Sequence, residues 1–205
     1  RFLFSNDSRT TLGTGLSATR EELAAMASPD AGYFGGGKEG AGVATVDRFL
    51  FSNDSRTTLG TGLSAASNAL AGMASSVAGY SAGGYDGSSR PTTVDRFLFS
   101  NDSRTTLGTG LSAARKDGST MGSSTIGYYG GGYTASTRVD TVDRFLFSND
   151  SRTTLSTGLS AGRTHLAGMA SNVAGYFGGG NTGAAQVSTV DRFLFSNDSR
   201  TTLGT

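Results

Sequence analysis

Apolar and polar residues alternate along short stretches of the chain, with the period of two that is typical of a β-strand. In VDRFLF (residues 190–195) the aspartate and both phenylalanines fall on one face of an extended strand. The valine, the arginine and the leucine fall on the other face. Apolar groups on both faces indicate a strand covered on both sides by neighbouring sheets. The next residues, SNDS, favour a turn because their side chains hydrogen-bond the nearby backbone, and RTTLGTGL then predicts a returning strand.

This hairpin pattern recurs along the whole chain. The segment VDRFLFSNDSRTTL begins at Val46, Val94, Val142 and Val190, and residues 1–12 repeat it without its first two residues. Arginines at intervals of 47, 48, 48 and 48 residues mark the register: Arg1, Arg48, Arg96, Arg144 and Arg192. A fixed period of this size predicts a solenoid, a propeller or an array.

Each period also contains two shorter strand patterns before the hairpin, such as RTHLAGMAS and GYFGGG in the fourth repeat. We therefore expect an all-β protein of tandem four-stranded antiparallel blades, of the β-propeller type. A helix over residues 19–28 is the alternative, because TREELAAMAS contains good helix formers. The equivalent residues 115–124 read RKDGSTMGSS, which disfavours a helix, and equivalent repeats share structure. A strand is thus predicted.

The repeat sets the blade boundaries. An unpaired hairpin is expected at 1–16, followed by blades at 17–63, 64–111, 112–159 and 160–205. The hairpin is surplus to a ring of four complete blades, so it needs two strands from another chain or from upstream residues. We expect a larger ring or a continuous array rather than a closed four-bladed monomer. Phe49, Phe51 and Leu59, with their counterparts, are predicted to pack between blades.

Three features of the repeat are typical of a known family. A double glycine ends the second strand (Gly36-Gly37, Gly83-Gly84, Gly131-Gly132, Gly179-Gly180), an aromatic residue precedes it (Tyr33, Tyr80, Tyr128, Tyr176), and an arginine precedes the first strand (Arg20, Arg115, Arg163). The chain resembles kelch-like β-propellers over its whole length. It is also similar to repetitive surface or phage-associated kelch-like proteins. It departs from the kelch pattern in having no tryptophan and in carrying Ser67 where the arginine stands in the other repeats.

Composition excludes several classes of protein. The 205 residues carry a formal net charge of +1 without a basic run, which argues against a nucleic-acid partner. Cysteine is absent, so neither a disulfide framework nor a thiolate metal site is expected. No apolar run is long enough to span a membrane. The 32 glycines have no Gly-X-Y period, which excludes collagen and indicates many turns.

Three catalytic or cofactor motifs occur, and the repeat argues against each. GLSAG at residues 158–162 matches a nucleophile elbow, but the equivalent stretches lack its second glycine, and His165 is the only histidine. GTGLSA at Gly13, Gly60 and Gly108 matches a dinucleotide fingerprint, but no helix is expected to follow. GGGKEG at residues 35–40 resembles a phosphate loop, with Glu39 where a serine or threonine is needed. No catalytic residue and no cofactor is therefore expected.

Two sets of aspartates recur, beside the arginine (Asp47, Asp95, Asp143, Asp191) and in the turn (Asp54, Asp102, Asp150, Asp198). Each turn offers too few oxygens for calcium, so a structural role is favoured and no metal site is expected. The same turn contains the N-x-S acceptor for N-glycosylation. The candidate acceptors are Asn6, Asn53, Asn101, Asn149 and Asn197.

These observations favour a structural protein: an extracellular or surface repeat scaffold, virion surfaces included, that forms filaments and has no catalytic activity. Identical edges present identical surfaces for head-to-tail self-association. The alternative is a propeller-type binding module for glycans or a protein partner, with Tyr85 and Tyr133 in its variable loops. Recent gene duplication would also explain the near-exact copies.

Overall fold

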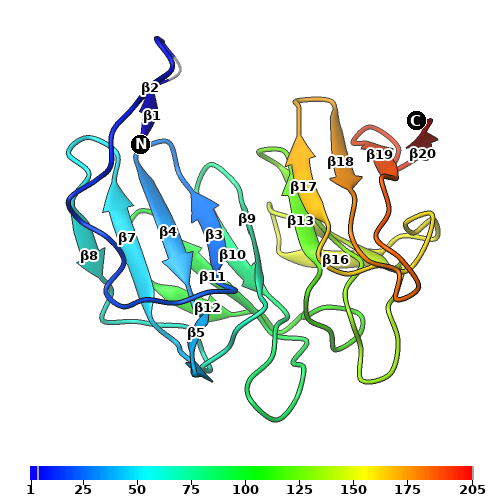
Figure 1. Cartoon of the computed structure of the whole chain (residues 1–205), viewed down its shortest axis with the longest axis horizontal. Helices are drawn as coiled ribbons and strands as arrows, with labels where there is room; N and C mark the ends of the chain where they lie inside the picture. Colours follow the sequence, from blue (N-terminus) through cyan, green and yellow to red (C-terminus); the bar gives the residue numbers. More distant parts are fainter. Residues whose placement is uncertain (4, 205) are drawn as a thin grey trace.

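The computed structural model describes residues 1–3 and 5–204, and it confirms an all-β fold. Four four-stranded antiparallel sheets follow one another along the chain, and in each sheet the strands pair in chain order (Figure 1). The described residues contain no helix, so none of them forms a helix that could cross a membrane. The stretch that could have been helical, residues 19–28, contains a strand instead.

Each of these sheets is here called a blade. Blade 1 contains β3 (Ala24–Ala27), β4 (Ala31–Gly35), β7 (Val46–Leu50) and β8 (Arg56–Thr58). Blade 2 contains β9 (Ala71–Ala74), β10 (Ala78–Ala82), β11 (Val94–Leu98) and β12 (Arg104–Thr106). Blade 3 contains β13 (Ser119–Gly122), β14 (Ile126–Gly130), β15 (Val142–Leu146) and β16 (Ser151–Thr154). Blade 4 contains β17 (Ala167–Ala170), β18 (Ala174–Gly178), β19 (Val190–Leu194) and β20 (Arg200–Leu203).

Two short hairpins lie outside the blades. The leading segment, residues 1–17, contains β1 (Phe2–Leu3) paired with β2 (Ser8–Arg9). A second hairpin in the loop of blade 1 pairs β5 (Lys38–Glu39) with β6 (Ala41–Gly42).

The SNDS segment forms the predicted turn in every blade. In blade 2 the Asn101 Oδ1 accepts a hydrogen bond from the Ser103 amide at 3.0 Å. Asp102 adopts a φ of 57°, a left-handed conformation that aspartate tolerates better than most residues. The turns at Asp7, Asp54, Asp150 and Asp198 have the same geometry, with φ between 53° and 58°.

The double glycines join consecutive blades. Gly84 has a φ of 103°, and its amide donates a hydrogen bond to the Arg115 carbonyl of blade 3 at 3.1 Å. A Cβ at Gly83 would lie 2.6 Å from the same carbonyl oxygen. Only glycine combines these conformations with so close an approach of two backbones. The pair is therefore a structural feature and needs no ligand to explain it.

The blades pack in chain order around their first strands. β3 lies against β9, β9 against β13, and β13 against β17 (Figure 1). Contacts of comparable extent between β17 and β3 do not occur within the described residues. Backbone bonds continue along the same series, from the Ala69 amide to the Glu22 carbonyl, from Asp117 to Ala69 and from His165 to Asp117. The four blades thus form an open array.

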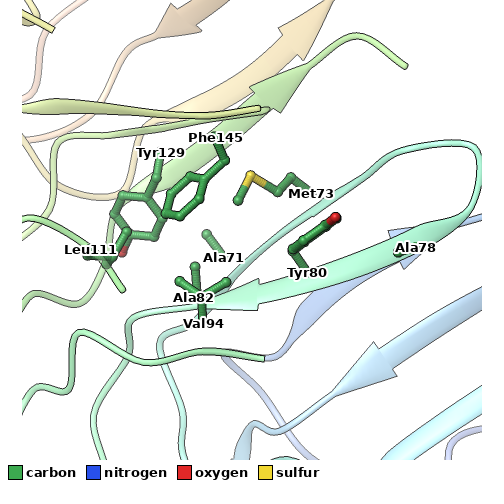
Figure 2. Close-up of a cluster of buried hydrophobic side chains, with 9 residues drawn as sticks. All are labelled: Ala71, Met73, Ala78, Tyr80, Ala82, Val94, Leu111, Tyr129 and Phe145. Atoms are coloured by element: carbon green, nitrogen blue, oxygen red, sulfur yellow. The ribbon is translucent and has the colours of Figure 1, made fainter. Parts of the chain in front are cut away.

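The hydrophobic core lies between blades rather than inside them. One cluster joins Met73, Tyr80 and Val94 of blade 2 to Tyr129 and Phe145 of blade 3 (Figure 2). Two equivalent clusters join blade 1 to blade 2 and blade 3 to blade 4. A single blade cannot bury its own apolar face, and stacking supplies the cover.

The predicted packing of phenylalanines between blades is confirmed in blades 2–4. The counterparts of Phe49, which are Phe97, Phe145 and Phe193, are fully buried. The prediction is wrong for Phe51, whose side chain is 45% exposed. Its counterparts stack on a tyrosine of the preceding blade, whereas Phe51 lines a groove beside the leading segment.

Candidate assembly interface

A buried aspartate ties each blade to the loop before it. The Asp143 carboxylate accepts hydrogen bonds from the amide and the hydroxyl of Ser112 at 2.8 and 2.9 Å, and from the Thr154 hydroxyl at 2.7 Å. Arg115, also fully buried, completes the site with an ion pair at 2.8 Å. A buried carboxylate requires such partners. This network explains the aspartate set that adjoins the repeated arginine.

The same kind of network holds the pKa of the aspartate low in blades 1 and 4. Burial would raise the pKa of Asp191, but hydrogen bonds from Ser160 and Thr202 and the charge of Arg163 lower it overall. Asp47 shows the same balance, with Ser17, Thr58 and Arg20 as its partners. These partners thus favour the charged form of Asp47 and of Asp191.

Blade 2 departs from this design because Ser67 replaces the arginine. Asp95 keeps its serine and threonine partners, and Arg104 lies 3.4 Å away. The aromatic residue over which Arg115 stacks in blade 3, Tyr129, is Ser81 in blade 2. The arginine and its aromatic cover are therefore lost together.

The second aspartate set forms what we call the interblade latch. The Tyr80 hydroxyl of blade 2 donates a hydrogen bond to Asp150 Oδ1 of the blade 3 turn at 2.9 Å, and Arg96 pairs with Asp150 Oδ2. The remaining latches join Tyr33 and Arg48 to Asp102, and Tyr128 and Arg144 to Asp198. Each boundary between consecutive blades therefore contains one latch of the same design.

Apolar contacts surround each latch. The Tyr80 ring stacks on Phe147 of blade 3, with ring centroids 4.8 Å apart. Met73 packs against Gly127 of blade 3, where a Cβ would lie 2.5 Å from the Met73 sulfur and would displace it. The repeated segment supplies the arginine to one side of the boundary and the phenylalanine and aspartate to the other. The segment that stays identical thus contributes to both sides of the interface, and the tyrosine and methionine come from the first two strands.

Burial and the hydrogen bond to Asp102 raise the pKa of Tyr33 to about 12. The same causes raise the pKa of Tyr80 and Tyr128. The latch tyrosines consequently stay neutral and donate their protons to the aspartates across the physiological range.

Blade 4 carries the residues of a latch without its aspartate. Within the described part of the chain, the side chains of Tyr176 and Arg192 make no hydrogen bond or ion pair with another residue. Met169 beside them is 67% exposed, whereas its counterpart Met121 is 4% exposed. We call the pair Tyr176 and Arg192 the open latch.

The leading segment meets blade 1 as the outer half of a preceding blade would. Arg1, the counterpart of Arg48, pairs with Asp54 of the blade 1 turn at 2.9 Å. Ser17 binds Asp47 through its amide and hydroxyl, as the equivalent serines do in the other blades. A half-open apolar groove of about 760 Å³ separates the segment from Phe34, Phe49 and Phe51. This groove corresponds to the place that the tyrosine and methionine of a preceding blade would fill.

The predicted glycosylation acceptors all lie at exposed turn tips. In each, the asparagine Oδ1 accepts a hydrogen bond from the serine amide two residues later, so the side chain also shapes the turn. Modification of Asn6, Asn53, Asn101, Asn149 and Asn197 stays a prediction.

The residues of the three sequence motifs make hydrogen bonds and ion pairs within the fold. Ser160 of the GLSAG stretch binds Asp191. The Nδ1 of His165 lies 3.1 Å from the Thr164 hydroxyl, and its Nε2 lies 3.7 Å from the Asp117 carboxylate. Lys38 of the GGGKEG stretch pairs with Glu21 and Glu22. Within residues 1–3 and 5–204, no three histidine, cysteine, aspartate or glutamate residues cluster as metal ligands would.

Sequence reasoning missed a second group, in the variable loops of blades 2 and 3. Arg90 lies over the rings of Tyr85 and Tyr133, at 5.8 and 5.3 Å from their centroids. Arg138 lies 5.7 Å from the Tyr133 centroid, and Lys116 lies 5.5 Å from that of Tyr85. These residues form a cation–aromatic ladder, because alternating cations and rings attract one another. Only the pair of tyrosines was visible as a signal in the sequence.

Comparison with known proteins adds no relative to these observations: no family model matches the chain, and no curated protein resembles it significantly.

Proposed function

We propose that this chain is a structural repeat scaffold that associates head to tail into larger assemblies and performs no catalysis. One observation carries the proposal: a single interface design recurs at three blade boundaries and stands half-formed on blades 1 and 4. Head-to-tail contacts between such faces produce a ring where the rotation closes and a filament where it does not. Of the two, we propose the filament.

Kinship with kelch-like propellers is part of the proposal. It is supported by the four-stranded blades, the double glycines and the aromatic residue before them. We place the protein outside the cell or at a surface, virion surfaces included. Support for this location comes from the N-x-S acceptor at the exposed tip of every turn.

The assembly test measures the mass of the purified 205-residue chain over a wide range of concentration, by size-exclusion chromatography with light scattering. We expect masses that rise from 20.9 kDa in whole multiples, and negative-stain images of filaments. Met169→Glu, which puts a charge on the open face of blade 4, is expected to restore the monomer. Val77→Glu, at an exposed site on blade 2, is the matched control. A chain that stays monomeric at every concentration contradicts the proposal.

The second candidate function is a binding module, and the cation–aromatic ladder is the observation that favours it. Arg90 and Arg138 have no carboxylate partner within the described residues, and each lies on a tyrosine ring. Such groups suit the carboxylates or sulfates of an acidic glycan. Retention on an immobilised sulfated glycan, lost in Arg90→Ala with Arg138→Ala but kept in Met169→Glu, would support binding as a separate function. Equal retention of all these variants would count against it.

A further inference from the structure

We propose that Asp7 of one copy of this chain binds Tyr176 and Arg192 of a second copy, and so forms a fourth interblade latch between molecules. The inference rests on the proposed self-association and names the residues that mediate it. Its occupant is the leading turn, residues 6–8, and its site is the open latch of blade 4.

The open latch has the composition of the three latches that are filled. In each of those, a tyrosine of the second strand and an arginine of the third strand bind one aspartate, as Tyr128 and Arg144 bind Asp198 at 2.6 and 2.7 Å. Tyr176 and Arg192 are directly cross-strand partners in blade 4, as Tyr128 and Arg144 are in blade 3. The open latch is thus built on the same strand register and lacks only an aspartate.

The leading turn has the geometry of the turns that fill the other latches. The Asn6 Oδ1 accepts a hydrogen bond from the Ser8 amide at 3.1 Å, which matches the bond between Asn149 and Ser151. Asp7 has a φ of 53°, close to the 56° of Asp150. Asp7 is exposed, and its carboxylate binds no other residue within the described part of the chain. The turn that carries Asp7 therefore already has, in the free chain, the conformation of the turns that fill the other latches.

The placement of the leading segment keeps its turn available. Arg1 on Asp54 and Ser17 on Asp47 fix the segment to blade 1 in the role of a third and fourth strand. In blades 2–4 the segment in this role presents its aspartate to the blade that precedes it in the array. Among the described residues no blade packs against the leading turn, and blades 1 and 4 share no extensive contact. The open latch of a second copy then supplies the missing blade.

Charge favours the same pairing. The guanidinium of Arg192 and the carboxylate of Asp7 attract each other, and neither has another side-chain partner within the described residues. The asparagines at the filled latches, such as Asn101, stay exposed, so a glycan on Asn6 is compatible with this contact.

Complementary variants test the pairing. Asp7→Arg keeps the open latch and loses the ligand, whereas Arg192→Asp keeps the ligand and loses the latch. Each variant alone is expected to self-associate at least about tenfold more weakly than the unaltered chain. An equimolar mixture is expected to associate more strongly than either variant alone, because it contains one intact contact and one contact with the charges exchanged. The double variant, with the charges exchanged, is expected to regain part of the association.

Asp30→Arg is the matched control, because Asp30 is an exposed aspartate whose carboxylate forms no latch. Melting temperature and circular dichroism verify that each variant folds, and Tyr176→Phe, which removes one hydroxyl, weakens association without the charge reversal. If Asp7→Arg and Arg192→Asp both associate as strongly as the unaltered chain, the proposed self-association stands and this latch is overturned. A different outcome is that X-ray scattering shows the monomer expanding when Arg192 is replaced by Asp. That result would mean that the latch is closed within one copy, and it overturns both the intermolecular latch and the proposed self-association.

Discussion

The boundary between blades 3 and 4 and the open face of blade 4 present nearly the same residues in different surroundings. Met121 is 4% exposed and Met169 is 67% exposed, although each occupies the same position of its first strand. Tyr128 is fully buried on Asp198, and Tyr176 has no such partner. The two regions differ only in the presence of a following blade, so the interfaces between blades contribute to the stability of this chain in addition to the blades themselves.

The largest expected difference in stability is between two phenylalanines of the repeated segment, Phe145 and Phe51. Phe145→Ala should destabilise the chain by about 3–5 kcal/mol, because Phe145 is fully buried against blade 2. Phe51→Ala should cost about 1 kcal/mol or less, because nearly half of its surface is exposed. Urea unfolding of both variants measures the difference. Equal losses would show that a further blade covers Phe51 in solution.

A smaller difference is expected at the methionines. Met121→Ala should cost about 2–5 kcal/mol, because it leaves a cavity above Gly175 of blade 4. Met169→Ala should change the stability of the monomer by less than about 0.5 kcal/mol. Thermal melting at low protein concentration gives both values. A cost at Met169 that appears only at high concentration would indicate cover by a second copy.

Much of the fold could be predicted from the sequence because it depends on local features. The period gave the number of blades, the alternation in VDRFLF gave the third strand, and SNDS gave the turn. The latch could not be predicted in the same way. Tyr80 and Asp150 are 70 residues apart, and their contact depends on how one blade is rotated on the next.

The error at Phe51 has a related cause. Its sequence context equals that of Phe99 and Phe147, and only the neighbouring blade differs. A repeat pattern predicts the same environment for every repeat, so the prediction is wrong for a repeat at an end of the array, where one neighbouring blade is absent from the described residues. A signal for the latch was present nonetheless, in the constant spacing of the tyrosine, arginine and aspartate between periods.

Substitution of the turn aspartates should lower the free energy of unfolding by a modest amount at a filled latch and hardly at all at the leading turn. Asp150→Asn removes the charge that binds Arg96 and should cost about 1–2 kcal/mol, because the pair is only partly exposed. Asp7→Asn should leave the stability of the monomer within about 0.5 kcal/mol. Chemical denaturation at low concentration measures both. An equal cost at the two positions would mean that Asp7 is already bound within its own chain.

The smallest effect at neutral pH is expected for Tyr33→Phe, which deletes one latch hydroxyl and becomes informative only in alkali. The pKa of Tyr33 is about 12 in the folded chain and 10.0 in its ordinary state. Since the folded value is the higher one, the stabilisation is complete below pH 10 and is lost as the pH rises toward 12. The unaltered chain should therefore lose stability over this window, and Tyr33→Phe should lose less. Tyr176→Phe is the matched control, because its hydroxyl binds no aspartate in the free chain, and it should retain the steep part of the profile. Unfolding measured at a series of alkaline pH values decides the point: identical profiles for the unaltered chain and Tyr33→Phe would show that the hydroxyl of Tyr33 does not bind Asp102 in solution.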